Sequence, residues 1–227
     1  DSLDEFFKIL GPDRCAQIET VSKDMHKPYI ASCNEYIPQA LEVADSFHVI
    51  KKLSEVMDKC RRELIESSDT PKSEKKGLKE MNWVIRYKQE NMSSRNHTKL
   101  NQLEKLNEPL YKAYLHKESF FEFFTFTPSE IGQAGDFLDE WVRDAASIPM
   151  EAFKYFVDYI NRHRDRILNI ITTGRSSSFS EAINRKINVL IGMAYGYHCL
   201  EYLKLKILQR CGAIGKYWTP EPAPMIS

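Results

Sequence analysis

The helix predicted over Ser176–Tyr197 carries the residues whose types and spacing best suit chemistry. Four polar residues fall at positions i, i+3, i+4 and i+7 and would share one face: Glu181, Asn184, Arg185 and Asn188. One acid, one base and two amides side by side make an unusual polar face for a helix. A solvated polar surface is the alternative interpretation of this face.

Two aspartates far upstream follow predicted strands. A strand predicted over Gln17–Ser22 is followed by Lys23 and Asp24, and a second strand over Ala40–Ala44 ends at Asp45. A helix that begins near Pro28 connects them, so the strands are expected to be parallel. Sites form at the carboxyl ends of parallel strands in open α/β sheets. Each aspartate could instead cap the helix that follows it.

Asp24, Asp45 and Glu181 together would suit a hard divalent cation, because Mg²⁺ prefers carboxylate oxygens and retains waters and substrate phosphates in its shell. In two-metal sites, carboxylates hold the ions that stabilise the attacking and leaving oxygens of an in-line phosphoryl transfer. Composition alone does not select these three from the 32 acidic residues of the chain.

Charge and composition narrow the classes of protein to consider. The 227 residues have no net charge, but residues 161–216 contain ten Lys and Arg against three acids, which makes a local anion-binding surface plausible. The five cysteines have no CxxC spacing and are expected to be free thiols of a reducing compartment. No apolar run approaches the roughly 20 residues of a membrane span, and no signal peptide opens the chain.

After His48 the chain is expected to be helical for over a hundred residues. A polar loop is predicted over Ser67–Lys76, and aromatic residues at helical spacing near residue 120 are expected to be core. The predicted helices are Val49–Ile65, Leu78–Tyr87, Ser94–Leu106, Pro109–Phe124, one from Thr127 to about Ala146, one from Pro149 to Arg162 or somewhat beyond, and Leu200–Arg210.

Three ordered blocks resemble the DDE transposase domain of the ISL3 family of bacterial insertion sequences. They are VSKDMHKPYI (Val21–Ile30), ALEVADSFHVIKKLSEVMDKCRREL (Ala40–Leu64) and FSEAINRKINVLIGMAYGY (Phe179–Tyr197). The resemblance spans nearly the whole chain, and three blocks in order are more specific than any single motif. It implies metal-dependent DNA strand cleavage and strand transfer, with Mg²⁺ or Mn²⁺ as cofactor.

The resemblance also implies an α/β fold that is mostly α in this chain. Residues 1–48 would form a partial RNase H-like core with strands near 17–23 and 40–45. Residues 49–170 would be a large all-helical insertion between the second and third catalytic acids. Residues 171–212 would complete the core with the helix that bears the third acid, and residues 213–227 would be a tail.

Carried over residue by residue, Asp24 is implied to be the second catalytic acid and Glu181 the third, and both would bind the metal. Asp45 matches the acid of an Asp-x-Phe-His block, with a supporting role. Residues expected to contact DNA are His48, Lys51, Lys52, Arg175, Asn184, Arg185 and Lys186. An isolated histidine such as His48 could also be structural.

The sequence departs from the family pattern at several positions. The family's first catalytic aspartate belongs on an earlier strand, and Asp1, Asp4 and Asp13 do not fit that context. Leu190-Ile191-Gly192-Met193 replaces a basic run, Ser46 an arginine and Ala182 a glycine. The leading hypothesis is therefore a catalytic-domain fragment that acts on insertion-sequence ends and target DNA.

Two alternatives stay open: an inactive or repurposed remnant that binds DNA or a protein through its helices, and a helical scaffold with no role in nucleic acids. The family implies a homo-oligomer in the active complex, no membrane association, and a cytoplasmic location at the bacterial nucleoid.

Overall fold

The structure is a computed structural model that describes residues 2–23, 27–174, 178–193 and 199–211. The chain divides into two compact units, residues 1–176 and residues 177–227, and each is described by itself.

The first unit begins with a small parallel sheet and three helices. The elements are α1 (Ser2–Leu10), α2 (Pro12–Cys15), β1 (Thr20–Lys23), α3 (Lys27–Tyr36) and β2 (Leu41–Ala44). Strand β1 pairs with β2 in parallel, in a register that runs from Thr20 opposite Leu41 to Lys23 opposite Ala44. The parallel pair joined by a helix is thus confirmed, but β1 starts later than predicted. Its expected first residues continue the turn of α2, since Ile18 N donates to the Cys15 carbonyl.

This part of the unit has its own apolar core, in which the helices α1 and α3 cover the turn before β1. Its buried residues are Phe7, Cys15, Cys33, Ile37 and Ala40. Gly11 permits the sharp turn between α1 and α2, because its φ of 82° lies in the left-handed region that favours glycine.

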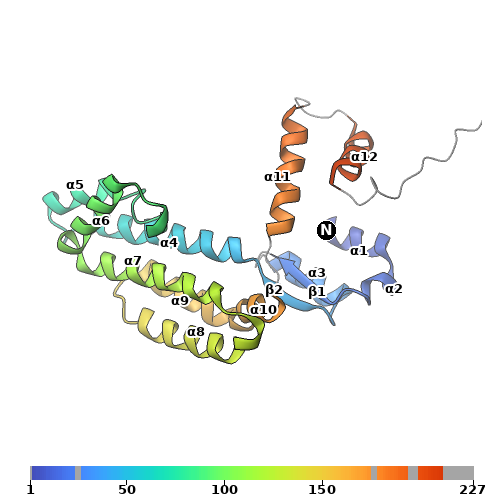
Figure 1. Ribbon diagram of the computed structural model, residues 1–227, viewed down its shortest axis with the longest axis horizontal. Coiled ribbons are helices and arrows are strands. Elements are labelled where there is room, and N and C mark those ends of the chain that lie inside the picture. The colour runs from blue at the N-terminus through green and yellow to red at the C-terminus, as the bar shows by residue number, and fades with distance from the viewer. Residues whose placement is uncertain (1, 24–26, 175–177, 194–198, 212–227) are drawn as a thin grey trace, which may run out of the picture. The chain divides into compact units, whose positions relative to one another are not determined.

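The rest of the unit is helical, as expected. The elements are α4 (Ser46–Glu66), α5 (Lys72–Glu80), η1 (Gln89–Asn91), α6 (Ser94–Leu106), α7 (Glu108–Phe120), η2 (Phe121–Thr125), η3 (Pro128–Glu130), α8 (Ile131–Ala145), α9 (Glu151–Arg162) and α10 (Arg164–Thr173). Figure 1 shows α4, α7, α8 and α9 packed along one another, with α5 and α6 at the end of α4 that lies away from the sheet. The aromatic residues predicted as core are buried, among them Tyr114, Phe120 and Phe123.

Two helices differ from the sequence-based expectation. The polar stretch predicted as a loop over Ser67–Lys76 ends at Pro71, and α5 then runs to Glu80, so the helix predicted over Leu78–Tyr87 is wrong in its position. Pro71 cannot donate a backbone hydrogen bond and suits the start of a helix. Residues 164–173 form the separate helix α10, which ends at Gly174 in the left-handed conformation with φ 57°.

Helix α10 packs against β2 and holds it through polar contacts. Asn169 Nδ2 donates to the Glu42 carbonyl at 2.8 Å, and the Arg166 guanidinium pairs with the Glu42 carboxylate. The last residues of β2, Val43 and Ala44, belong to the large core of the helices. Strand β2 therefore links the small sheet to the helical bundle.

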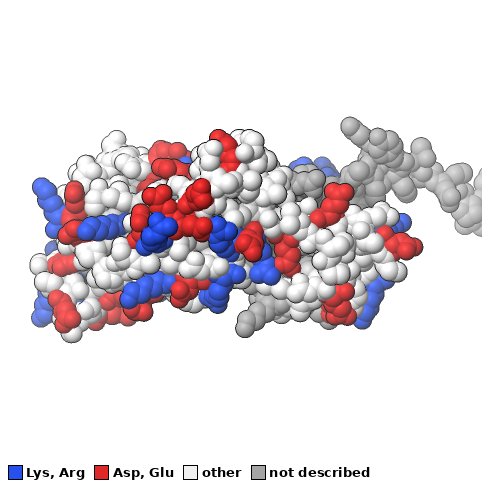
Figure 2. Space-filling model, turned by 90° about the horizontal axis from the view of Figure 1, so that it is seen from below, with Lys and Arg blue, Asp and Glu red and all other residues white. Residues whose placement is uncertain are grey.

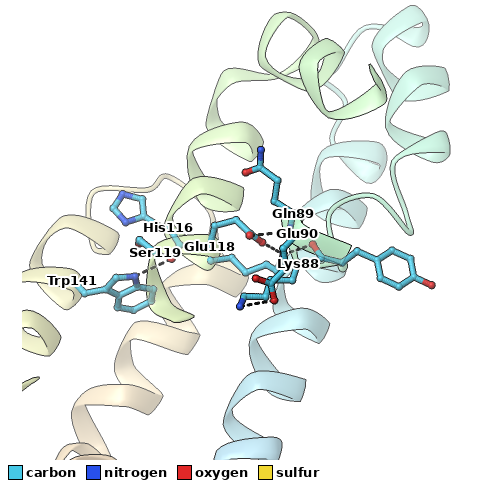
Figure 3. A network of polar contacts seen from close by, with 9 residues as sticks. Lys88, Gln89, Glu90, His116, Glu118, Ser119 and Trp141 are labelled. Carbon is cyan, nitrogen blue, oxygen red and sulfur yellow. Dashed lines mark hydrogen bonds and ion pairs between the residues drawn. The ribbon is translucent and has the colours of Figure 1, made fainter. Parts of the chain in front are cut away.

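A polar network fixes the segment between α5 and α6 on α7 (Figure 3). Gln89 N donates to Glu118 at 2.9 Å, and the fully buried Lys117 donates to the Tyr87 carbonyl at 2.7 Å and to Glu118 at 2.6 Å. On the other side of α7, Trp141 Nε1 donates to the His116 carbonyl at 2.9 Å and so joins α8 to α7. These bonds satisfy polar groups that would be costly to bury unpaired.

Asp58 of α4 is a buried carboxylate surrounded by three arginines. Arg61 and Arg86 each approach it at 2.7 Å, and the more exposed Arg62 at 3.1 Å. Burial alone would raise the pKa of Asp58, but the hydrogen bonds from Arg61 and Arg86 outweigh burial and hold the pKa below its usual value. The charged form is therefore favoured in the folded protein.

We expect Asp58→Ala to lower the free energy of unfolding at pH 7 by about 3–5 kcal/mol, because it leaves the buried Arg61 without its counter-ion. Because folding lowers the pKa of Asp58, its carboxylate adds to the free energy of unfolding at pH values above the pKa of the unfolded state. This stabilisation is lost as the pH falls through the pKa of the folded state. Urea unfolding at pH 7 and below pH ~4 measures this difference. Arg62→Ala, at an exposed partner of Asp58, should cost no more than about 1 kcal/mol. Equal losses in the two variants would contradict the buried-pair interpretation.

Candidate functional site

Asp45 joins the carboxyl end of β2 to the start of α4. Its Oδ1 accepts from the backbone of Phe47 at 2.9 Å, and so caps the helix, while its Oδ2 lies 2.8 Å from His48 Nδ1. The cap explains why α4 begins at Ser46, three residues before the predicted start. The helix cap expected for Asp45 is therefore present, and the same carboxylate also pairs with His48.

The two lysines predicted to contact DNA on α4 have different surroundings. Lys51 is exposed. Lys52 is partly buried, and its ammonium lies 4.6 Å from the ring centroid of Tyr159 and 5.5 Å from that of Tyr155. Lys52 is thus held on a surface of aromatic rings contributed by α9.

Several candidate residues fall partly or wholly outside the described residues. Asp24 and Arg175 lie outside them. Glu181 and Asn184 belong to α11 (Ser178–Met193), whose backbone is described, but their side chains are not. The helical placement of Glu181 is therefore confirmed, and its distance from Asp24 stays a prediction.

In the second unit, α11 packs against α12 (Leu200–Cys211). A cleft of about 670 Å³ between the two helices is lined by four cations and three apolar residues: Arg185, Lys186, Lys206, Arg210, Val189, Leu190 and Met193. Among the side chains that the structure describes, which do not include that of Glu181, no carboxylate lies within 4.0 Å of these four cations. By contrast, Lys204 on the same helix pairs with Glu201 at 3.0 Å.

Lys206 and Arg210 were not singled out from the sequence, although both lie in the basic stretch 161–216. They are four residues apart on α12, a spacing that places them on one helix face, and this signal could have identified them. On α11, Ile187 and Leu190 are only partly buried, and Val189 is exposed.

The metal site stays a prediction of the sequence. Among the described residues, no three His, Cys, Asp or Glu side chains gather in a way that could hold a metal ion. Both oxygens of Asp45 are engaged by Phe47 and His48, which fits a supporting role better than direct ligation. Asp24 and Glu181 retain the carboxylate chemistry that Mg²⁺ or Mn²⁺ requires.

None of the helices in the described parts of the chain combines the length and apolar character needed to cross a membrane. Cys15, Cys33, Cys60 and Cys199 form no disulfide bonds among the described residues, and burial raises the pKa of Cys60 to about 12.

Comparisons with known proteins agree on one family. The model of the DDE transposases of the ISL3 type, described as "Transposase", matches residues 1–207. The chain is 30% identical over 213 residues to the "Transposase for insertion sequence element IS1557" of Mycobacterium tuberculosis, covering 85% of this chain and 47% of that protein. It is 27% identical over 204 residues to the "Transposase for insertion sequence element IS1001" of Bordetella parapertussis, covering 89% and 50%. The chain spans about half the length of these relatives. No solved structure matches it.

We expect Asp45→Ala to lower the free energy of unfolding by about 1 kcal/mol, because α4 loses its N-cap. Asp45→Asn, which keeps a side-chain oxygen as acceptor, should cost a few tenths of a kcal/mol at most. Chemical denaturation of both variants measures the difference. Equal destabilisation by alanine and asparagine would show that the carboxylate does not stabilise the fold as a cap.

Proposed function

Because the chain belongs to the ISL3 family of DDE transposases, we propose that it is part of the catalytic domain of a DNA transposase, with a partial RNase H-like core and an all-helical insertion. The proposed activity is metal-dependent DNA strand cleavage and strand transfer of an insertion sequence. The proposed partners are the element ends and target DNA.

The observation that carries this proposal is the cationic cleft between α11 and α12. Arg185 and Lys186 lie on the same helix as Glu181, and Lys206 and Arg210 of α12 line the same cleft. Cations without carboxylate partners create a positive potential that attracts a polyanion. Backbone phosphates of DNA are the polyanion that a transposase must hold close to its catalytic carboxylates.

Asp24 and Glu181 would hold the divalent ion, and Asp45 would orient His48 beside them. A bound Mg²⁺ or Mn²⁺ supplies stabilisation of the attacking and leaving oxygens at phosphorus. In cleavage, water forms a new P–O bond as the bond to the 3′ oxygen breaks. In strand transfer, that 3′-hydroxyl forms a P–O bond with target DNA as a target P–O bond breaks. We propose that the complete site includes a third carboxylate, which none of Asp1, Asp4 or Asp13 supplies.

The active complex is proposed to be a homo-oligomer that acts at the nucleoid in the cytoplasm. A non-catalytic remnant is the second candidate, and the exposed Met193 favours it, because it lies in the segment Leu190–Met193 that replaces the basic run of the family pattern. Such a surface would suit a protein partner better than DNA.

Glu181→Gln in the intact protein should reduce strand transfer at least about 100-fold, beyond the loss typical of outer-shell partners of a metal. DNA affinity should be nearly unchanged, since the cationic cleft remains. A strand-transfer assay with a plasmid donor and a gel-shift assay measure the two effects. Glu201→Gln, the same change at an exposed acid of α12, should leave strand transfer intact. Full activity of Glu181→Gln would exclude Glu181 as a catalytic acid, and absence of strand transfer by the unsubstituted protein would favour the non-catalytic remnant.

Arg210→Gln should weaken binding to duplex DNA uniformly across sequences and lower the slope of log K against log salt by about one, because one phosphate contact is lost. Lys204→Gln is the matched control on α12, since Lys204 is already paired with Glu201. Fluorescence anisotropy at several salt concentrations gives both slopes. Identical slopes for the two variants would exclude the cleft as a phosphate-binding site.

A further inference from the structure

A second group of cations lies in the first unit, where α4, α9 and α10 meet. We name it the Tyr155 cluster, and its members are Lys52, Tyr155, Tyr159, Arg162, His163 and Arg166. The Lys52 ammonium and the Arg162 guanidinium lie 5.5 Å and 5.9 Å from the ring centroid of Tyr155. Both charges are therefore positioned over or beside one ring, which is itself 51% exposed.

The charges of Lys52 and Arg162 are not neutralised within the described parts of the chain. No carboxylate there lies within 4.0 Å of either cation. The only hydrogen bond that Arg162 makes among those residues is from its Nε to the Asp158 carbonyl at 3.2 Å. Some other surface cations have such partners: Lys154 pairs with Glu151 on the same helix, and Lys112 pairs with Glu108 on α7. On the face shown in Figure 2, acidic and basic side chains are likewise intermingled.

His163 is close to these cations, and their charges affect its pKa. Its ring centroid is 4.8 Å from that of Tyr159, and its Nδ1 is 3.3 Å from Arg166 Nη1. Burial lowers the pKa of His163, and the charges of Arg166 and Arg162 lower it further. Lys52 of α4 acts in the same direction, and Glu42 of β2 opposes it. Positive charge from three helices thus converges on one imidazole, with a single acid in opposition.

Like charges gathered on a folded surface repel one another and lower stability. The rings of Tyr155 and Tyr159 offset part of this cost, since each attracts a cation by roughly 0.5–1 kcal/mol. An anion placed between Lys52 and Arg162 would offset the remaining repulsion between these two cations. The rings also restrict the Lys52 ammonium, so less conformational entropy would be lost when it binds a phosphate.

We propose that the Tyr155 cluster is a second DNA-binding surface, at which Lys52 and Arg162 contact backbone phosphates separately from the α11–α12 cleft. This inference rests on the proposed function insofar as DNA is the partner. A backbone phosphate fits because it is a polyanion that presents charge at regular spacing and is held by lysine and arginine without any requirement for base recognition.

The test measures binding of the 227-residue chain to a DNA duplex of arbitrary sequence in the presence of EDTA. Fluorescence anisotropy gives the affinity at salt concentrations between 50 and 200 mM. Arg162→Gln should lower the salt slope by about 0.9 and weaken binding about eightfold at 0.1 M salt. Arg162→Lys should retain most of the slope, because a point charge still contacts phosphate. Lys112→Gln is the control, since it removes one exposed but paired cation from α7.

Each outcome has a distinct meaning. A slope reduced in Arg162→Gln but not in Lys112→Gln supports the Tyr155 cluster as a DNA-binding surface. Equal slopes in these two variants, together with a reduced slope in Arg210→Gln, overturn the cluster and leave the proposed function in place. Absence of binding by the unsubstituted chain contradicts both. Thermal unfolding of each variant checks that the fold is intact.

A pH series gives an independent readout. A phosphate between the cations would raise the pKa of His163 from its lowered value, so binding would take up a proton and become tighter as pH falls from 8 to 6. His163→Gln should remove this part of the pH dependence. The same pH dependence in His163→Gln and in the unsubstituted chain would exclude His163 from the binding surface.

Discussion

Strand β2 is held on two sides, and the packing of residues 2–174 depends on that arrangement. Its backbone pairs with β1, while Asn169 of α10 binds the Glu42 carbonyl and Arg166 binds the Glu42 carboxylate. A two-stranded sheet alone is marginally stable, so cover from a helix is required. Because Asp45 follows β2 directly and caps α4, the same contacts fix where the longest helix of the bundle begins. The Asp45–His48 pair is consequently positioned by β2.

The charged side chains discussed above are of two kinds. Some are buried and paired, which suits a structural role, and others are surface cations without a carboxylate partner, which suits a binding role. Asp58 and Lys117 are buried, and each is surrounded by partners that satisfy it. Lys52 and Arg162 in the first unit, and the cations of the α11–α12 cleft in the second, have no carboxylate partner among the side chains that the structure describes. Satisfied charges specify a fold, whereas unsatisfied surface cations remain available to a polyanion.

The sequence predicted much of the fold where local signals and tertiary packing agree. Helix α6 runs from Ser94 to Leu106 as predicted, and the two strands joined by α3 are parallel. Helix α5 was misplaced, because the buried side chain of Leu78 and the pairing of Arg86 with Asp58 are tertiary contacts that local propensity does not report. The pairing of α10 with β2 joins residues more than a hundred positions apart, which no local pattern encodes.

Less of the candidate site could be predicted from the individual residues. Spacing placed Glu181 and Arg185 on one helix, but the choice of Asp24 and Glu181 among the acids came from family resemblance, which the family match supports. The Tyr155 cluster depends on the packing of α4 on α9, and it could not be read from the sequence.

We propose that Asp24 and Glu181 hold one divalent ion together. Titration of the intact protein with Mn²⁺, followed by the electron paramagnetic resonance signal of the free ion, tests it without any DNA. We expect both Asp24→Asn and Glu181→Gln to reduce the bound Mn²⁺, and Asp45→Asn to retain it. Unchanged Mn²⁺ binding in either of the first two variants would contradict the claim.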